Sequence, residues 1–180
     1  ARLRARDVVD GGGSDVAESS RAAQVSLRLT PPVLRGGDPL AMLASALESF
    51  GLLEGRRAEV FAVVAELVNN AVDHGLLGLD SKLKADAEGF ATFYEERARR
   101  IAEAEDGYVD VSLDVEPREA ECVIRVTVED SGAGFDVAAL DGESDGELHG
   151  RGLSMVRELC ESLRYSERGN RVEAVFRAAA

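Results

Sequence analysis

Two side chains on one expected helix have the chemistry of a metal–nucleotide site. Glu66 and Asn70 stand four positions apart in the segment Glu-Leu-Val-Asn-Asn-Ala-Val-Asp-His-Gly, residues 66–75. One helical turn separates them, so both project from the same stripe and can reach one ligand. Mg²⁺ accepts amide oxygens and usually completes its shell with water and substrate phosphates. Asn70 could therefore hold the ion while Glu66 handles a proton; the alternative is a polar helix face that only meets water.

A glycine-containing turn follows an expected strand. Residues 122–129 alternate between two sets of side chains, and Asp130-Ser131-Gly132-Ala133-Gly134-Phe135 comes directly after them. Gly132 and Gly134 would let the backbone approach a ligand closely. The Asp130 carboxylate could accept a hydrogen bond from an adenine amino group. The alternative is an ordinary Asp-Ser-Gly turn, with Phe135 returning to the core.

A third segment has the features of an anion site. Gly150-Arg151-Gly152 opens a stretch in which apolar residues recur at helical spacing up to Leu163. Free N–H groups and the positive end of a helix dipole favour phosphates at such a start, and glycines allow close approach. Arg151 could add a phosphate contact or could be solvated. Glycines are also common at helix starts, so this pattern alone is weakly specific.

These residues need elements that hold them together. The helix expected at 56–74 has a broad apolar arc and a polar side that carries Glu66 and Asn70. Asn69 could also be a ligand, but it lies about 100° further around the helix. His74 and Gly75 are expected to end this helix, because glycine readily adopts the left-handed conformation that closes a helix.

The remaining elements predict an α/β two-layer sandwich. Strands alternate with helices along the chain, and the strand at 108–115 carries polar residues on one face, which predicts a sheet with one face that is wet or covered only at its edge. Pro31 and Pro32 are expected to end the first strand. The other expected elements are a strand at 24–30, helices at 39–50, 85–105 and 152–163, and a closing strand at 171–177.

Composition agrees with one domain in a reducing compartment. A chain of 180 residues can bury about 70% of its unfolded surface. Cys122 and Cys160 lie in apolar patterns without metal-site spacing, which predicts core thiols. The chain has no signal peptide or membrane-spanning run, so a cytoplasmic location is expected. The formal net charge of -13 argues against nucleic acid or an anionic membrane as partner.

The three motifs together resemble a known superfamily. E-x-x-x-N, D-x-G-x-G and G-x-G, in this order and spacing, are similar to the N, G1 and G2 boxes of the GHKL ATPases, which have the Bergerat fold. The resemblance covers about residues 25–177. It implies a mixed sheet covered on one face by helices. Within the superfamily, the chain looks most like the anti-sigma-factor serine kinases, and its 73–80 tract resembles kinase domains fused to a receiver and a PP2C-type phosphatase.

The resemblance also implies roles for single residues. Glu66 would be the general base and Asn70 the Mg²⁺ ligand, while Asp130 would contact adenine. The remaining nucleotide-binding residues would be Gly132, Gly134, Gly150, Arg151 and Gly152. The family transfers the ATP γ-phosphate to a serine of a STAS-domain anti-anti-sigma protein, and its members also bind sigma factors and often form homodimers. The alternative is a nucleotide-gated module that sequesters a regulator without catalysis.

The chain is expected to consist of a linker and one domain, and the domain to contain an insertion and a lid. Residues 1–23 are expected to be a flexible linker or a remnant of expression, and residues 24–180 a single kinase domain. Within it, 76–106 would be a helical insertion and 136–149 an acidic ATP lid without Lys or Arg. In the insertion, Phe90, Phe93 and Tyr94 precede a charged run. They could dock a partner, or they could anchor the helix to its own domain.

Overall fold

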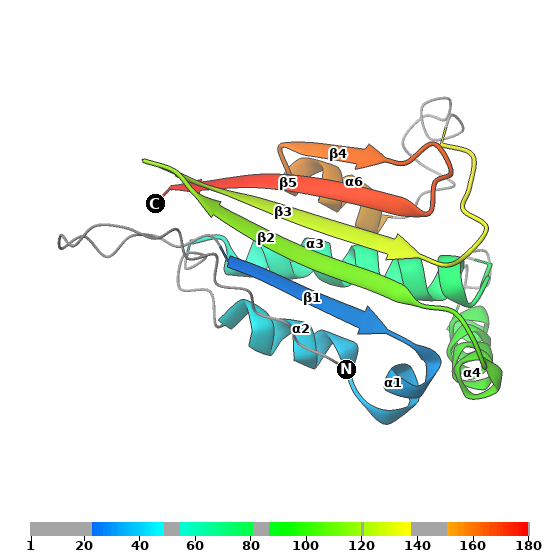
Figure 1. Cartoon of the computed structure of the whole chain (residues 1–180). Coiled ribbons are helices and arrows are strands. Elements are labelled where there is room, and N and C mark those ends of the chain that lie inside the picture. Colours follow the sequence, from blue (N-terminus) through cyan, green and yellow to red (C-terminus); the bar gives the residue numbers. More distant parts are fainter. Residues whose placement is uncertain (1–22, 49–54, 81–86, 120, 138–150, 180) are drawn as a thin grey trace.

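The domain consists of one sheet with helices packed on one of its faces (Figure 1). The computed structural model describes residues 23–48, 55–80, 87–119, 121–137 and 151–179. The strands are β1 (Ala23–Leu29), β2 (Val109–Pro117), β3 (Glu121–Asp130), β4 (Ser162–Tyr165) and β5 (Arg171–Ala179). The helices are α1 (Pro31–Gly36), α2 (Pro39–Glu48), α3 (Arg57–Asn70), η2 (Ala71–Leu76), α4 (Ala87–Glu103) and α6 (Arg151–Leu159), of which η2 is a π-helical continuation of α3.

The five strands form a sheet in the order β1-β2-β3-β5-β4. Neighbouring strands are antiparallel at all four pairings. The two-layer sandwich is therefore as predicted, but among the described strands the sheet is antiparallel rather than mixed. The crossover through α6 joins β3 and β4, which run in the same direction. Because β5 lies between them, no parallel pair forms.

Alternation along β2 and β3 gives the sheet one apolar and one polar face. Val111 and Val128 are register partners and are both buried beneath the helices. On the helix-free face, Arg28 of β1 donates two hydrogen bonds to Asp110 of β2, with the shorter at 2.5 Å. A shallow depression on this face is lined by Ser26, Arg28 and Asp110, among others. The expected wet face is thus present, and it is covered with paired charges.

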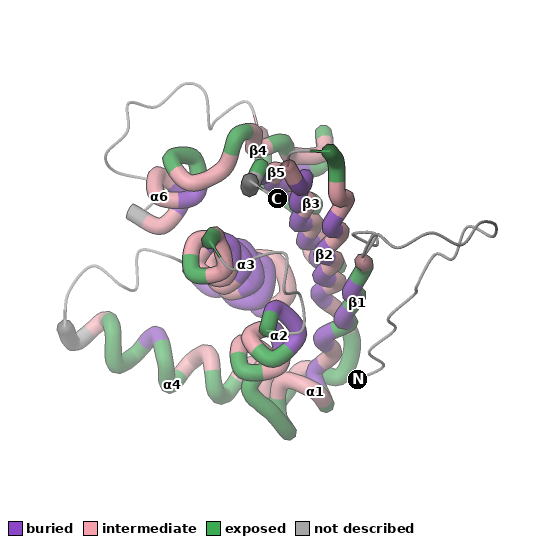
Figure 2. The backbone as a smooth tube through the Cα atoms, turned by 90° about the vertical axis from the view of Figure 1, so that its left-hand side faces the viewer, coloured by how far each residue is buried: buried purple, intermediate pink, exposed green. Residues whose placement is uncertain are grey.

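Helix α3 supplies the centre of the core. Figure 2 shows its buried stripe turned toward the strands, with α2 and α6 on either side. Its buried residues are Val60, Val63, Val64, Leu67 and Val68. Each fully buried side chain of this size contributes about 1.5–3 kcal/mol relative to an exposed one. This packing fixes the rotation of α3 and therefore the direction in which its polar side faces.

Several expected boundaries differ from the observed ones. Strand β1 begins at Ala23, and Pro31 starts α1 because proline fits the first turn of a helix, where its missing N–H is not needed. The helix expected to reach residue 163 ends at Leu159, and Leu163 pairs with Ala174 in a strand. Helical apolar spacing continues across this junction, so the sequence pattern does not reveal the change.

The end of the α3 segment also differs. Gly75 lies inside η2 and has no positive φ, whereas Gly78 adopts the left-handed conformation with φ 60°. The helical segment therefore ends at Leu76, close to the predicted end, but the left-handed glycine that follows it is Gly78 and not Gly75. Gly75 has a different role, because it lies against the Asp130 side chain.

Helix α4 lies where the sequence predicts the helix of the insertion. One of its aromatic residues, Phe93, anchors it to the domain. Phe93 is fully buried, whereas Phe90 and Tyr94 are about half exposed. Arg35 of α1 donates hydrogen bonds to the carbonyl oxygens of Ile101 and Ala104, each at 2.9 Å. The anchoring interpretation thus holds for Phe93. None of the helices in the described ranges is long and apolar enough to cross a membrane.

Candidate functional site

Glu66 and Asn70 lie on one side of α3, as the four-residue spacing predicts. The Asn70 amide nitrogen donates a hydrogen bond of 3.1 Å to Oε1 of Glu66. Both residues are partly buried, so they are neither core residues nor freely solvated. Because the amide nitrogen faces Glu66, the amide oxygen is the atom that points away from this carboxylate. The pair therefore presents a carboxylate and a hard oxygen side by side.

Helix α6 brings a glycine to the same point. Gly152 lies in the first turn of α6, and a methyl group added there would overlap the Glu66 carboxylate. The backbone of this turn therefore passes directly beside the carboxylate, although the two are distant in sequence. Gly150 lies outside the described residues, and so does the Arg151 side chain. The roles expected for Gly150 and Arg151 therefore stay predictions.

The turn after β3 forms the second part of the site. Asp130 is 8% exposed, and its Oδ1 accepts a hydrogen bond of 2.8 Å from the Gly132 N–H. Burial raises the pKa of Asp130, while the Gly132 hydrogen bond and the charge of Arg168 act in the opposite direction. The carboxyl group is thus held in a defined place, with its charge partly desolvated. This is a suitable environment for recognising a planar hydrogen-bond donor.

Gly75 closes this part of the site from the helix side. A methyl group at Gly75 would overlap the Asp130 carboxyl group, and one at Gly132 would overlap the Gly75 carbonyl oxygen. Two segments that are distant in sequence, η2 and the turn after β3, therefore meet within van der Waals contact. Glu66 and Gly75 are separated by nine positions of one continuous helical segment, or roughly 13 Å of rise. One elongated ligand could contact both ends.

The turn between β4 and β5 holds the turn after β3 in place. Asn170 donates from its amide to the Asp130 carbonyl oxygen at 2.8 Å, and its own carbonyl oxygen accepts from the Asp130 N–H at 2.9 Å. Arg168 donates to the carbonyl oxygens of Gly132 and Ala133. Gly134 has φ 79° and packs against the Arg168 carbonyl oxygen, where a side chain would not fit. The conformation of this turn is thus fixed by contacts with Arg168, which lies 35 positions after Ala133 in the sequence.

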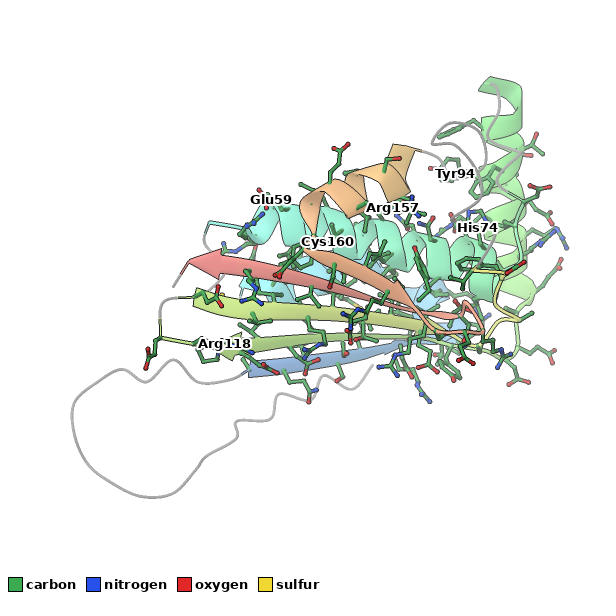
Figure 3. All side chains as sticks on the ribbon, turned by 90° about the horizontal axis from the view of Figure 1, so that it is seen from above. Glu59, His74, Tyr94, Arg118, Arg157 and Cys160 are labelled. Carbon is green, nitrogen blue, oxygen red and sulfur yellow. The ribbon has the colours of Figure 1, made fainter. Side chains whose placement is uncertain are left out.

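Phe135 does not return to the core. It is 43% exposed, and its ring meets Tyr165 edge-on, with 5.4 Å between the ring centroids. Burial raises the pKa of Tyr165 to about 12. The expected lid begins here, but residues 138–149 lie outside the described ranges. Figure 3 labels Arg157 on α6, the helix that begins beside Glu66, and Cys160, which directly follows the end of this helix.

Several residues that shape the site were not anticipated from sequence. The sequence predicts a helix end at Gly75, and it gives no indication of a role for Asn170, Arg168, Asp73 or Arg97. Their contacts join segments that are far apart in sequence, with 24 positions between Arg97 and Asp73 and 40 between Asn170 and Asp130. Local spacing carries no signal for such contacts. The glycine before Asn170 indicates a turn, but not which loop it would meet.

Comparison with known proteins places the chain in a family. The model of the histidine kinase-like ATPase domain matches residues 39–176, which include α3, the turn after β3 and α6. A comparison with curated proteins gives no match. The chain belongs to the histidine kinase-like ATPase domain family, and its helix-covered sheet agrees with the GHKL ATPase fold. It is accordingly an ATP-binding domain of the GHKL type.

The site residues fit the cofactors of this family. The Asn70 amide oxygen is a ligand type that Mg²⁺ accepts, and Mg²⁺ typically needs only one or two protein ligands beside nucleotide phosphates. The glycine contacts at Gly75 and Gly132 leave the Asp130 carboxyl group in a narrow, backbone-lined setting. Bound Mg²⁺ would offset negative charge on the phosphates. The protein's own contribution is to position these groups.

Proposed function

We propose that this domain is a protein serine/threonine kinase of the anti-sigma-factor type. It would transfer the ATP γ-phosphate to a serine of a STAS-like anti-anti-sigma protein in a bacterial partner-switching system. One observation carries the proposal: the Glu66 carboxylate is held by Asn70 at the point where α6 begins. A domain that needed only to recognise adenine would have no use for a carboxylate at the other end of the site.

The arrangement supports a simple division of roles. Adenine would lie at Asp130, the phosphates near Asn70 and Gly152, and the acceptor hydroxyl within reach of Glu66. In the transfer, the bond between the γ-phosphorus and its bridging oxygen breaks and a bond to the serine oxygen forms. Glu66 takes the serine proton, and ADP leaves. Phosphoryl transfer depends mainly on positioning and electrostatics, so no covalent enzyme intermediate is needed.

The experiment has two stages. Calorimetric titration with ATP and Mg²⁺ first compares the wild type with Asn70→Ala and Asp130→Asn. We expect wild-type binding in the micromolar range, about -8 kcal/mol, and weaker binding in both variants. The absence of wild-type binding at millimolar ATP would overturn the nucleotide site. The second stage incubates the domain with STAS-domain anti-anti-sigma proteins and ATP, and detects phosphoserine by mass spectrometry.

Glu66→Gln separates catalysis from binding. It keeps the size and hydrogen-bonding capacity of the side chain but cannot accept the serine proton. We expect ATP affinity within a few fold of the wild type and loss of transfer by about 10²- to 10⁴-fold. Glu59→Gln is the matched control, because Glu59 lies on the same helix and pairs with Arg56 near the surface. Wild-type nucleotide-dependent binding of a partner without any phosphorylation would instead favour the non-catalytic switch.

A further inference from the structure

Helix α4 is clamped to the segment that follows the catalytic stretch of α3. Arg97 donates from Nε to Oδ1 of Asp73 at 2.6 Å, and the Asp73 side chain is only 7% exposed. One turn further along α4, Arg100 donates to the carbonyl oxygens of Leu77 and Gly78 at 2.7 and 2.8 Å. The two arginines therefore hold both ends of the 73–78 segment. Figure 3 shows α4 beside this end of the helix, near the labelled His74.

The clamped segment is also one wall of the Asp130 site. Gly75 stands two positions after Asp73 and lies against the Asp130 carboxyl group, and its carbonyl oxygen meets Gly132. The Asp73 carbonyl oxygen accepts from the Leu79 N–H at 2.8 Å, which folds the chain back on itself. A shift of this segment would move the Gly75 backbone relative to Asp130. The position of Gly75 is thus tied to the arginines of α4.

Charge makes Arg97 the stronger of the two clamps. A buried carboxylate is costly unless it is paired, so the position of Asp73 is favourable where the Arg97 guanidinium reaches it. Arg100 contacts neutral carbonyl oxygens and also pairs with Glu96 of its own helix. Loss of Arg97 would therefore remove a positive charge from beside a buried carboxylate. The burial of the Asp73 carboxylate would then cost more free energy.

We propose that Arg97 is a positioning residue for the nucleotide site. Through Asp73 it holds Gly75 against Asp130 and Gly132, so that the adenine end of the site is formed before the nucleotide arrives. Such preorganisation raises affinity by lowering the cost of ordering on binding. This inference rests on the proposed function, because it assumes that adenine lies at Asp130. It gives the insertion a direct influence on nucleotide binding.

The test compares two arginines of one helix. Arg97→Met removes the charge and keeps most of the apolar stem, and Arg99→Met is the matched control. Arg99 is exposed, and its ion pairs with Glu96 and Glu103 both lie within α4. Affinities for ATP, ADP and GTP are measured by calorimetry, well below the melting temperature of every variant.

We expect Arg97→Met to weaken ATP and ADP binding by the same factor, about tenfold, and to reduce the preference for ATP over GTP. Arg99→Met is expected to leave both quantities unchanged. Arg97→Lys, which keeps the charge, should give an intermediate affinity and provides the test if Arg97→Met does not fold. Restoration by the double variant Asp73→Asn with Arg97→Gln, which replaces the ion pair by a neutral hydrogen bond, would support the clamp directly.

The outcomes separate this proposal from the proposed function. A wild type that binds ATP, together with Arg97→Met and Arg97→Lys variants that bind it equally well, overturns the positioning role while leaving the kinase proposal intact. A lower melting temperature with unchanged ATP and GTP affinities also overturns it, because that is the result of a purely structural role. A wild type that does not bind ATP overturns both proposals.

Discussion

The Glu66 carboxylate lies where two distant parts of the chain meet. Asn70 holds it from the same helix, and the backbone at Gly152 passes beside it. A carboxylate that accepts a proton must keep its distance to the reacting hydroxyl, and misplacement by even an ångström is costly. Glycine at position 152 is therefore part of the geometry of Glu66. Because glycine has no side chain, the Glu66 carboxylate has room to lie beside the start of α6.

Replacing Gly152 with alanine should separate activity from stability. The new methyl group would overlap the Glu66 carboxylate, which is the mobile end of a side chain and can turn away. Alanine also favours helix over glycine by about 0.5–1 kcal/mol. We expect an unchanged or higher melting temperature, while phosphoryl transfer falls by about 10²-fold. Thermal denaturation and a transfer assay measure the two effects.

Gly36→Ala is the control for that experiment. A methyl group at Gly36 would meet no atom within 4 Å, so this substitution changes backbone freedom without touching Glu66. Transfer activity should stay at the wild-type level in Gly36→Ala. Equal transfer rates in Gly152→Ala and the wild type would show that the position of Glu66 does not depend on this glycine.

Asp130 should oppose folding as an ionised group. Because burial raises its pKa above the ordinary value of 3.8, its charged form is less stable in the folded than in the unfolded chain. The cost is complete above the folded-state pKa and disappears as the pH falls below the unfolded value. Asp130→Asn should therefore raise the free energy of unfolding of the nucleotide-free domain at neutral pH. The gain should vanish in acid.

Urea denaturation of the wild type and of Asp130→Asn across the acidic to neutral range measures this difference. ATP titration at neutral pH accompanies it, since the same variant should bind ATP more weakly. A stability difference that stays constant with pH would contradict the assignment of the cost to the Asp130 charge. The pair of measurements also tests whether this carboxylate is kept for binding at the expense of stability.

Among the elements, α4 combines a buried anchor with an exposed surface. Phe93 is fully buried, and its neighbour Tyr94 is 53% exposed. The two rings touch edge-on, with 5.7 Å between their centroids. The ion pairs of Glu96 with Arg99 and Arg100 lie on the helix surface and lower the pKa of Glu96 to about 2. Such solvated pairs within one helix add little to stability. The helix is attached to the domain by Phe93 and by the contacts of Arg97 and Arg100 with the 73–78 segment.

Adjacent alanine substitutions should distinguish the two aromatic residues. Phe93→Ala is expected to lower the free energy of unfolding by about 3–5 kcal/mol, because it leaves a cavity in the core. Tyr94→Ala should change it by only about 0.5 kcal/mol, as is usual for surface positions. Urea denaturation measures both. A comparable loss in both variants would show that the Tyr94 side also packs against the domain in solution.

Charge is the dominant property of the whole molecule. The formal net charge of -13 repels a nucleotide that is itself an anion. Under the proposed function, the site would therefore attract the nucleotide only at short range, through backbone N–H groups, Asn70 and Mg²⁺. Long-range steering would slow the approach of ATP rather than assist it. The same charge favours partners with basic surfaces.

Salt should accelerate ATP association. Added salt shortens the screening length to about 8 Å at physiological ionic strength, which weakens the repulsion between the domain and the nucleotide. We expect the association rate of Mg-ATP in stopped-flow experiments to rise as salt is added, with free Mg²⁺ held constant. A rate that falls with salt would indicate that a locally positive field at the site outweighs the net charge.

Local patterns determined much of the fold from sequence. Alternation in β2 and β3, together with the apolar arc of α3, identifies which faces are buried, because a period of 2 or 3.6 is a direct consequence of backbone geometry. The same geometry puts Glu66 and Asn70 on one stripe, which the hydrogen bond between them bears out. The three motifs were sufficient to indicate the superfamily, and the match to residues 39–176 agrees with that.

Only the tertiary structure decided which segments meet. The change from α6 to β4 occurs within a continuous helical apolar pattern, because pairing with β5 outweighs local preference. From sequence, Gly75 is predicted to end a helix, but in the structure it contacts Asp130. Arg97 is predicted to be one charge in a solvated run, but it pairs with buried Asp73. The spacing of residues in the sequence determines in which direction the side chains of one helix or strand point. The distance between elements depends on how all side chains pack together, and that is a property of the whole fold.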